Sequence, residues 1–233
     1  ADGSWHVWTV PVAGGEPRRL TASALPELYP RYTRDGRWVT YCTWSSGPDR
    51  VWRVPRAGGP PEPLTPERSA DDQYGEVSPD GRWLAFARTE DGQTRVYLQP
   101  VSGGPARRLT NGPSTVPRWS PDGTLIAFAP DRSDTGGVFV VRTDGTGERR
   151  LCATGGWPAW FADGSRIAYQ VVGFDNRQRI RAVGLDGGDE GLDREPAVGD
   201  ELATSPAHCR TEGSRPQVLV DEDPGDAARI HRG

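Results

Sequence analysis

A four-residue turn motif recurs along this 233-residue chain at intervals of 41 to 45 residues, and this repeat constrains the fold more than any other feature. Ser-Pro-Asp-Gly suits a type I turn because it combines a polar first residue, a φ-restricted proline and a final glycine. Repetition at this period, built from short β segments, is typical of propeller blades. The four copies are Thr33-Arg34-Asp35-Gly36, Ser78-Pro79-Asp80-Gly81, Ser120-Pro121-Asp122-Gly123 and Phe161-Ala162-Asp163-Gly164.

Other segments repeat in step with the turn. A β-branched residue followed in most copies by an aromatic one occurs at Val7-Trp8, Val51-Trp52, Val96-Tyr97, Val138-Phe139 and Ile180-Arg181. The first four copies lead through a glycine-containing turn to Leu20-Thr21, Leu64-Thr65, Leu109-Thr110 and Leu151-Cys152. Each repeat therefore has room for four short strands.

The third repeat illustrates the predicted blade. Residues 116–119 form a strand before the turn, and the apolar run 125–129 after it is expected to be buried on both faces. Residues 138–141 form a third strand and residues 149–151 an exposed edge strand. The 30 glycines and 22 prolines agree with a chain that turns this often. We predict an all-β fold, a β-propeller of four-stranded antiparallel blades.

The motifs resemble a known family. Pro117-x-Trp119-Ser-Pro-Asp-Gly, then Ile126-Ala127-Phe128, a Gly-Gly turn and Leu-Thr resemble the TolB-type, WD40-like β-propeller repeat, which also occurs in prolyl-oligopeptidase-like peptidases. The resemblance covers residues 5–188. It implies a bacterial recognition protein in a periplasmic or extracytoplasmic location, although propellers of this fold serve many functions.

The predicted division places propeller repeats in residues 1–188, with blade elements at 5–21, 26–65, 70–110, 113–152 and 155–188. Residues 189–233 form an acidic, divergent tail with 11 acidic and 5 basic side chains. Two interpretations stay open. In one, the tail supplies an eroded closing blade, with a strand at 217–220 completed by the N-terminal hairpin, for about five blades. In the other, the chain is an incomplete fragment of a six- to eight-bladed ring.

Catalytic and metal sites are not expected, so we predict that the chain is not an enzyme and has no cofactor. All 28 basic residues are arginine, which excludes lysine-dependent chemistry, and no Gly-x-Ser-x-Gly elbow accompanies the three histidines. His6 is expected at a surface or strand edge, and the unclustered Cys42, Cys152 and Cys209 are expected to be structural thiols. The repeated aspartates are explained by turn geometry. A propeller lyase or glycosidase would need inward-facing histidines and paired carboxylates, which the sequence does not supply.

The candidate binding residues lie just before each turn, where innermost strands line the propeller axis. Two positions there are rich in aromatic and charged side chains, which favour recognition surfaces. The alternative is that the aromatic residues pack between blades. The candidates are Tyr29, Arg31, Tyr74, Glu76, Arg118 and Trp157.

The predicted partner is a protein or peptide bound at the channel face by a monomeric, non-enzymatic recognition module. The alternative is a regulatory propeller from a larger enzyme or sensor, such as a prolyl-oligopeptidase-like peptidase or a receptor kinase. We expect no nucleic-acid binding, because the net charge is −4 and arginines are spread over every repeat. We expect no membrane insertion, because no apolar run approaches 18 residues.

Overall fold

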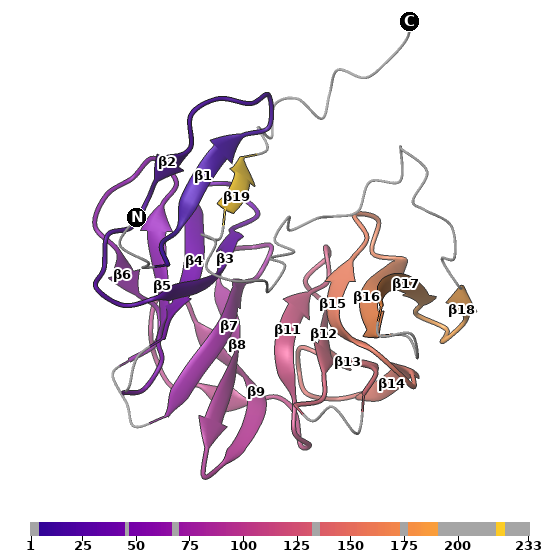
Figure 1. The fold of residues 1–233 in the computed structure, drawn as a ribbon. Coiled ribbons are helices and arrows are strands. Elements are labelled where there is room, and N and C mark those ends of the chain that lie inside the picture. The colour runs from indigo at the N-terminus through magenta and orange to yellow at the C-terminus, as the bar shows by residue number, and fades with distance from the viewer. Residues whose placement is uncertain are drawn as a thin grey trace, which may run out of the picture.

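The structure, a computed structural model, describes residues 5–44, 47–66, 70–131, 136–172, 177–190 and 218–221. The described residues form four four-stranded antiparallel sheets and one three-stranded sheet, with no helix among them. Figure 1 shows the sheets arranged around a centre like the blades of a propeller. The predicted all-β propeller class is confirmed.

The four complete blades follow the sequence repeats in order. The first blade contains β3 (Glu27–Tyr32), β4 (Trp38–Thr43), β5 (Val51–Pro55) and β6 (Glu62–Pro63). The second contains β7 (Asp71–Val77), β8 (Trp83–Glu90), β9 (Gln93–Pro100) and β10 (Arg107–Arg108). The third contains β11 (Thr115–Trp119), β12 (Leu125–Ala129), β13 (Val138–Arg142) and β14 (Arg149–Cys152). The fourth contains β15 (Gly156–Trp160), β16 (Arg166–Val172), β17 (Gln178–Gly184) and β18 (Asp189–Glu190).

The repeated turn motif joins the first and second strands of each blade, as predicted. In the second blade the Gly81 N–H donates to the Ser78 carbonyl at 2.9 Å, and Gly81 has a φ of 75°. The Asp80 carboxylate accepts the Arg82 backbone N–H at 3.0 Å and the Ser78 hydroxyl at 2.6 Å. The aspartate therefore stabilises its own turn, and the equivalent aspartates of the other blades make the same backbone contact.

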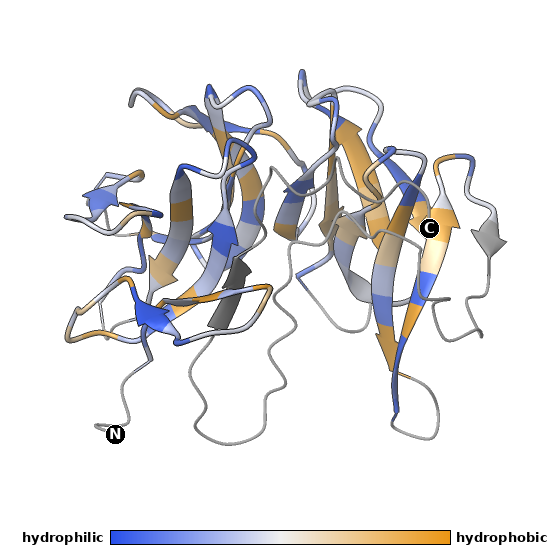
Figure 2. Ribbon diagram, turned by 90° about the horizontal axis from the view of Figure 1, so that it is seen from above, coloured by the Kyte–Doolittle hydropathy of each residue, from blue (hydrophilic) through white to orange (hydrophobic). Residues whose placement is uncertain are grey.

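The second strand of each blade is buried, as its apolar composition predicts. Leu84, Ala85 and Phe86 of β8 are fully buried, as are Ile126 and Ala127 of β12. Figure 2 shows the hydrophobic stretches concentrated along strands and the hydrophilic ones in turns and edges. The edge strand β14 has two exposed arginines followed by a buried leucine and cysteine, which confirms the predicted outer strand.

The Leu-Thr element makes the same pair of bonds at three of its copies. Its leucine N–H donates to the carbonyl of Val7, Val51 or Val96, and its threonine hydroxyl accepts the N–H of that same valine. The bonds to Thr21, Thr65 and Thr110 measure 2.9, 3.1 and 3.1 Å. Cys152 holds this position in the third blade and instead directs its thiol to the Thr154 carbonyl at 3.3 Å.

The two ends of the described chain meet in the three-stranded sheet, which we call the terminal sheet. It consists of β19 (Val218–Asp221), β1 (Trp8–Pro11) and β2 (Arg18–Arg19). β19 takes the place of a second strand beside β1, as the closing-blade interpretation expects. However, the pair is parallel, with Trp8 opposite Val218, whereas the corresponding strands of the four blades are antiparallel. The division at residues 188 and 189, and the blade number of the full ring, stay predictions.

His6 is a correction. It is 3% exposed, with Nδ1 3.3 Å from Oε2 of the fully buried Glu27, so the predicted surface or edge position is wrong. The same carboxylate oxygen accepts the Thr21 hydroxyl. His6 lies where the terminal sheet meets the first blade. The sequence shows only that it precedes a strand, whereas the packing of one sheet against the other buries it.

Candidate functional site

The innermost strand of every blade contains a β-bulge at the same position. In each case three steps along the inner strand match two steps along its neighbour, so one extra residue is inserted. The inserted step lies in the segments Tyr29-Pro30, Tyr74-Gly75, Val116-Pro117 and Trp157-Pro158. Proline lacks an N–H and glycine tolerates close approach, so both suit a bulge.

The residue that opens each bulge has an unusual backbone conformation. Tyr29, Tyr74, Val116 and Trp157 have φ values of 56°, 56°, 52° and 54°, in the left-handed region. Bulky and β-branched residues rarely adopt it, and such strain is concentrated at functional sites. The same strained conformation recurs at equivalent positions of the four blades, all at the same height along the propeller axis. These positions are therefore candidates for a functional site.

Three of these four residues are aromatic, and their rings form one cluster, which we call the axial rings. The ring centroids of Tyr29 and Tyr74 lie 4.3 Å apart, and those of Tyr29 and Trp157 lie 6.2 Å apart. Tyr74 and Trp157 meet edge to face at 5.8 Å. The first and fourth blades therefore touch through side chains 128 positions apart in sequence. These rings pack against one another at the axis, and Trp157 remains 43% exposed.

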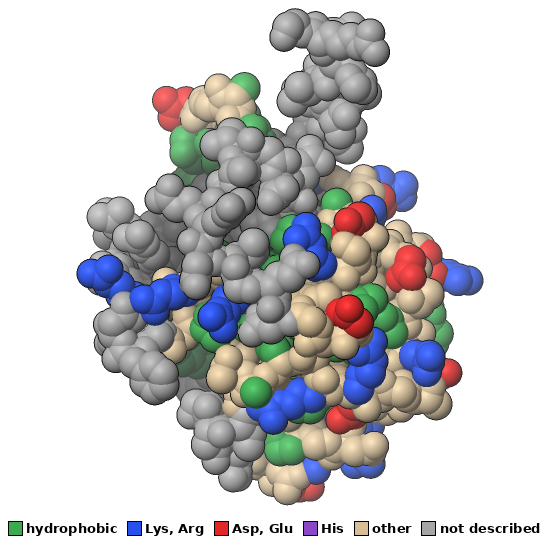
Figure 3. All heavy atoms as spheres, turned by 90° about the vertical axis from the view of Figure 1, so that its right-hand side faces the viewer, with side chains coloured by type: hydrophobic (Ala, Val, Ile, Leu, Met, Phe, Trp, Pro, Cys, Tyr) green, Lys and Arg blue, Asp and Glu red, His purple; other side chains and the backbone are tan. Residues whose placement is uncertain are grey.

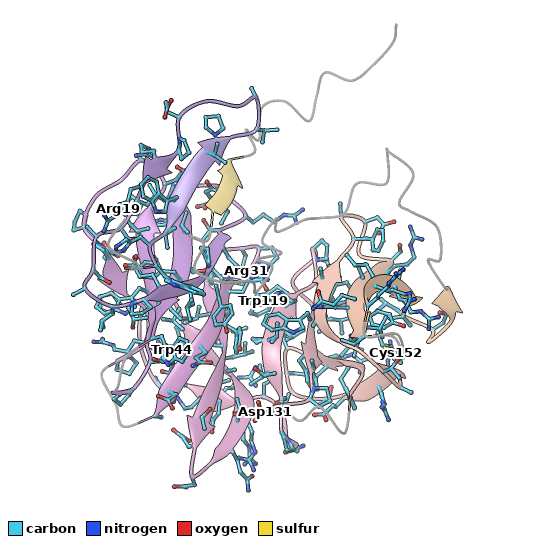
Figure 4. All side chains as sticks on the ribbon, in the orientation of Figure 1. Arg19, Arg31, Trp44, Trp119, Asp131 and Cys152 are labelled. Atoms are coloured by element: carbon cyan, nitrogen blue, oxygen red, sulfur yellow. The ribbon has the colours of Figure 1, made fainter. Side chains whose placement is uncertain are left out.

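The charged candidates lie two residues after the bulge-opening residue on three neighbouring inner strands. Arg31 lies on β3, Glu76 on β7 and Arg118 on β11, and Ala159 takes this place on β15. Figure 4 places Arg31 and Trp119 near the middle of the molecule, with Arg19 and Cys152 toward its outside. Arg118 is 4% exposed, and Arg31 is half-buried.

Burial governs the electrostatics of this group. Desolvation lowers the pKa of Arg118 to about 9, the Arg31 charge lowers it further, and Glu76 opposes the shift. Burial also lowers the pKa of Arg31, against the influence of Glu76. Tyr74 lies two residues before Glu76 on β7, so the charged group adjoins the axial rings. The structure therefore brings the six candidates into two adjoining groups, and their role in binding stays a prediction.

Trp119 is a residue of this region that the candidate set missed. Its backbone N–H donates to Glu76 Oε2 at 3.1 Å and its indole Nε1–H to the Glu76 carbonyl at 3.0 Å. Trp119 thus fixes the Glu76 carboxylate from the next blade. The tryptophan before the turn was visible in the sequence, but its partner in another blade was not.

A groove of about 690 Å³ lies between the second and third blades, and its lining includes Trp119 but none of the six candidates. Its lining includes the turn residues Asp80 and Asp122, together with Arg82, Arg107 and Trp83. Arg82 pairs with Asp80 at 2.7 Å, and Arg107 donates to the Thr143 carbonyl. Because these charged side chains already bind neighbouring protein groups, we consider the groove a weaker candidate for a binding site than the axis.

The two cysteines that the structure describes are buried and form no disulfide. Cys42 and Cys152 are buried free thiols, and burial raises the pKa of Cys42 to about 12. This agrees with structural roles, while Cys209 lies outside the described residues. Within the described part of the chain, no three His, Cys, Asp or Glu side chains gather as metal ligands would. None of these described residues belongs to a helix with the length and apolar character needed to cross a membrane.

Comparison with known proteins fits this architecture. The profile of the TolB beta propeller domain family matches residues 74–207, more than half of the chain. The chain belongs to this family. No curated protein sequence matches it significantly.

Solved TolB structures share the fold. TolB from Acinetobacter baumannii superposes with a TM-score of 0.68 at 21% identity, over 82% of this chain and 49% of that one. A structure assigned as TolB from Agrobacterium tumefaciens gives 0.66 at 25% identity, over 77% and 66%. The TolB-type chain described here thus spans about half to two thirds of these relatives. A puromycin-hydrolysing peptidase from Mycobacterium tuberculosis gives 0.58 at 19% identity, over 81% and 31%.

Proposed function

We propose that this TolB-type propeller is a non-enzymatic recognition module that binds a protein or peptide at the channel face. The axial rings carry the proposal. Three aromatic side chains from three blades converge there on strained backbone, and one of them, Trp157, is 43% exposed. An aromatic platform held by rigid strands provides a large contact area at little cost in conformational entropy.

The charge distribution supports a peptide or protein in preference to a nucleic acid. On the described part of the one face in Figure 3, the right-hand side of the Figure 1 view, arginine side chains are interspersed with Asp and Glu and form no continuous basic stripe. We further propose an extracytoplasmic location, on the strength of the TolB family match and the likeness to solved TolB structures.

A second candidate is a regulatory propeller within a longer enzyme or sensor. It is supported by the peptidase neighbour, of which the superposition with this chain covers 31%. The full reading frame discriminates the two. A Gly-x-Ser-x-Gly hydrolase domain on the same polypeptide would favour the second candidate, and its absence would favour the first.

The binding proposal is tested with peptides selected from an unbiased displayed library on the full chain. Selected peptides are synthesised and titrated calorimetrically against wild type and Trp157→Ala. We expect Trp157→Ala to weaken binding about tenfold or more, because buried aromatic anchors dominate such interfaces.

The control is Trp44→Ala. Trp44 is 60% exposed and follows β4 outside the axial rings, so its removal tests the effect of losing any exposed tryptophan. Affinity that is unchanged by Trp157→Ala in a folded protein, or reduced equally by both substitutions, would contradict the proposal.

A further inference from the structure

Among the described residues, the propeller axis carries an imbalance of charge that no side chain compensates. Two arginines and one glutamate, Arg31, Arg118 and Glu76, come from equivalent positions of three neighbouring blades. Buried cations cost free energy unless a carboxylate or a full set of acceptors satisfies them. The partners of each guanidinium therefore decide whether this group is complete.

Arg118 is incompletely satisfied. Its Nη1 donates to the Pro117 carbonyl at 2.7 Å, but its buried Nε has no hydrogen-bond partner. Neither Arg118 nor Arg31 forms an ion pair, and the Arg31 guanidinium has no hydrogen bond, as far as the described residues show. The Arg118 side chain is only 4% exposed, yet its Nε–H donor has no acceptor among the described residues.

Glu76 does not complete the group. Its Oε2 is held by the Trp119 backbone N–H, and its charge acts on both arginines without pairing with either. One carboxylate against two guanidinium groups leaves one positive charge. An added carboxylate would balance it and supply acceptors in the planar geometry that arginine recognises.

We propose that Arg31 and Arg118 form a carboxylate site at the axis, beside the axial rings. The ligand class is then an acidic peptide, with the carboxylate on the arginines and apolar or aromatic groups on Tyr29, Tyr74 and Trp157. The peptide part of this inference rests on the proposed function. The carboxylate is supplied either by an Asp or Glu side chain or by a peptide C-terminus.

The direct probe is acetate titrated into the full chain. The arginine Nε–Hε resonances are followed by NMR, with sodium chloride at equal ionic strength as the reference, and the Arg118 signal is assigned by its loss in Arg118→Gln. We expect a saturable shift of this signal with acetate and none with chloride. A signal unmoved by acetate would overturn the site.

Matched peptides form the second arm. Peptides selected on wild type are prepared with Glu and Gln at the same position, each with a free or amidated C-terminus, so that the two sources of carboxylate are separated. We expect the preferred carboxylate to strengthen binding about tenfold, as a charge-assisted contact does. Arg118→Gln and Arg31→Gln should each remove that preference. Arg37→Gln, which alters a 74%-exposed side chain in the first turn, should retain it.

Glu76→Gln separates a binding role from a purely structural one. Removing the competing negative charge should increase carboxylate affinity several-fold. If neutral and acidic peptides bind equally while Trp157→Ala still abolishes binding, the carboxylate site is wrong and the recognition function stands. If acetate binds but no peptide does, the recognition function is wrong and the carboxylate site stands.

Discussion

The indole Nε1–H of Trp160 donates to the carbonyl oxygen of Arg118 at 3.0 Å, across the boundary between the fourth and third blades. Trp119 makes the same bond to Glu76 across the next boundary. Both tryptophans directly precede the turn motif, so this sequence position ties the third blade to the second and the fourth blade to the third. The two bonds therefore also fix the backbone of Glu76 and Arg118, two members of the charged group.

Trp160→Phe is expected to destabilise the protein by about 1 kcal/mol. The ring remains packed at this 4%-exposed position, but the interblade hydrogen bond is lost and a buried carbonyl loses its donor. Chemical denaturation measures the change. Trp83→Phe, at a 37%-exposed position, should be close to neutral, and equal effects of both substitutions would show that the bond contributes nothing.

Gly75→Ala is expected to cost about 2 kcal/mol, because a Cβ there would lie 2.3 Å from Val51 Cγ1. Adding Val51→Ala should recover part of the loss, so the two substitutions should be non-additive in a double-mutant cycle. Gly112→Ala is the control, since its Cβ meets nothing within 4 Å. If the effects of the two substitutions on the free energy of unfolding are fully additive, the backbone at the bulge relaxes and the new Cβ does not clash with Val51 of the first blade.

Asp80→Asn is expected to destabilise the protein near neutral pH but not in strong acid. Hydrogen bonds from Ser78 and Arg82 lower the folded-state pKa of Asp80 to about 2, below its ordinary 3.8. The ionised turn therefore stabilises the fold above about pH 4, and this contribution is lost as pH falls through 2. Denaturation curves between pH 2 and 6 check this. A stability difference that stays constant across the range would refute it.

Arg118→Met is expected to stabilise the fold by about 1 kcal/mol while removing carboxylate binding, because a buried uncompensated charge is replaced by apolar contacts. Since the folded-state pKa of about 9 lies below the ordinary 12.5, wild-type stability should rise between these pH values, and the variant should lack this rise. Denaturation of both proteins is the measurement. A clear loss of stability in Arg118→Met would show that Arg118 is structural.

The fold was accessible from sequence because its determinants are local. Ser78-Pro79-Asp80-Gly81 specifies a turn within four residues, and the alternation around it specifies the paired strands. The inner-strand bulges are also marked in the sequence, by the prolines that follow Tyr29, Val116 and Trp157. The positions of the six candidates relative to the axis followed from the same repeat.

What the sequence by itself determined is the blade: its turns, its four strands, its buried second strand and its outer edge. The tertiary structure decided what the blades share. Only ring assembly buries His6 against Glu27, pairs β19 in parallel with β1 and brings Tyr29 to Trp157. The reason is physical. Turn and strand preferences act over a few residues, whereas contacts at the axis and between sheets depend on how separate blades meet.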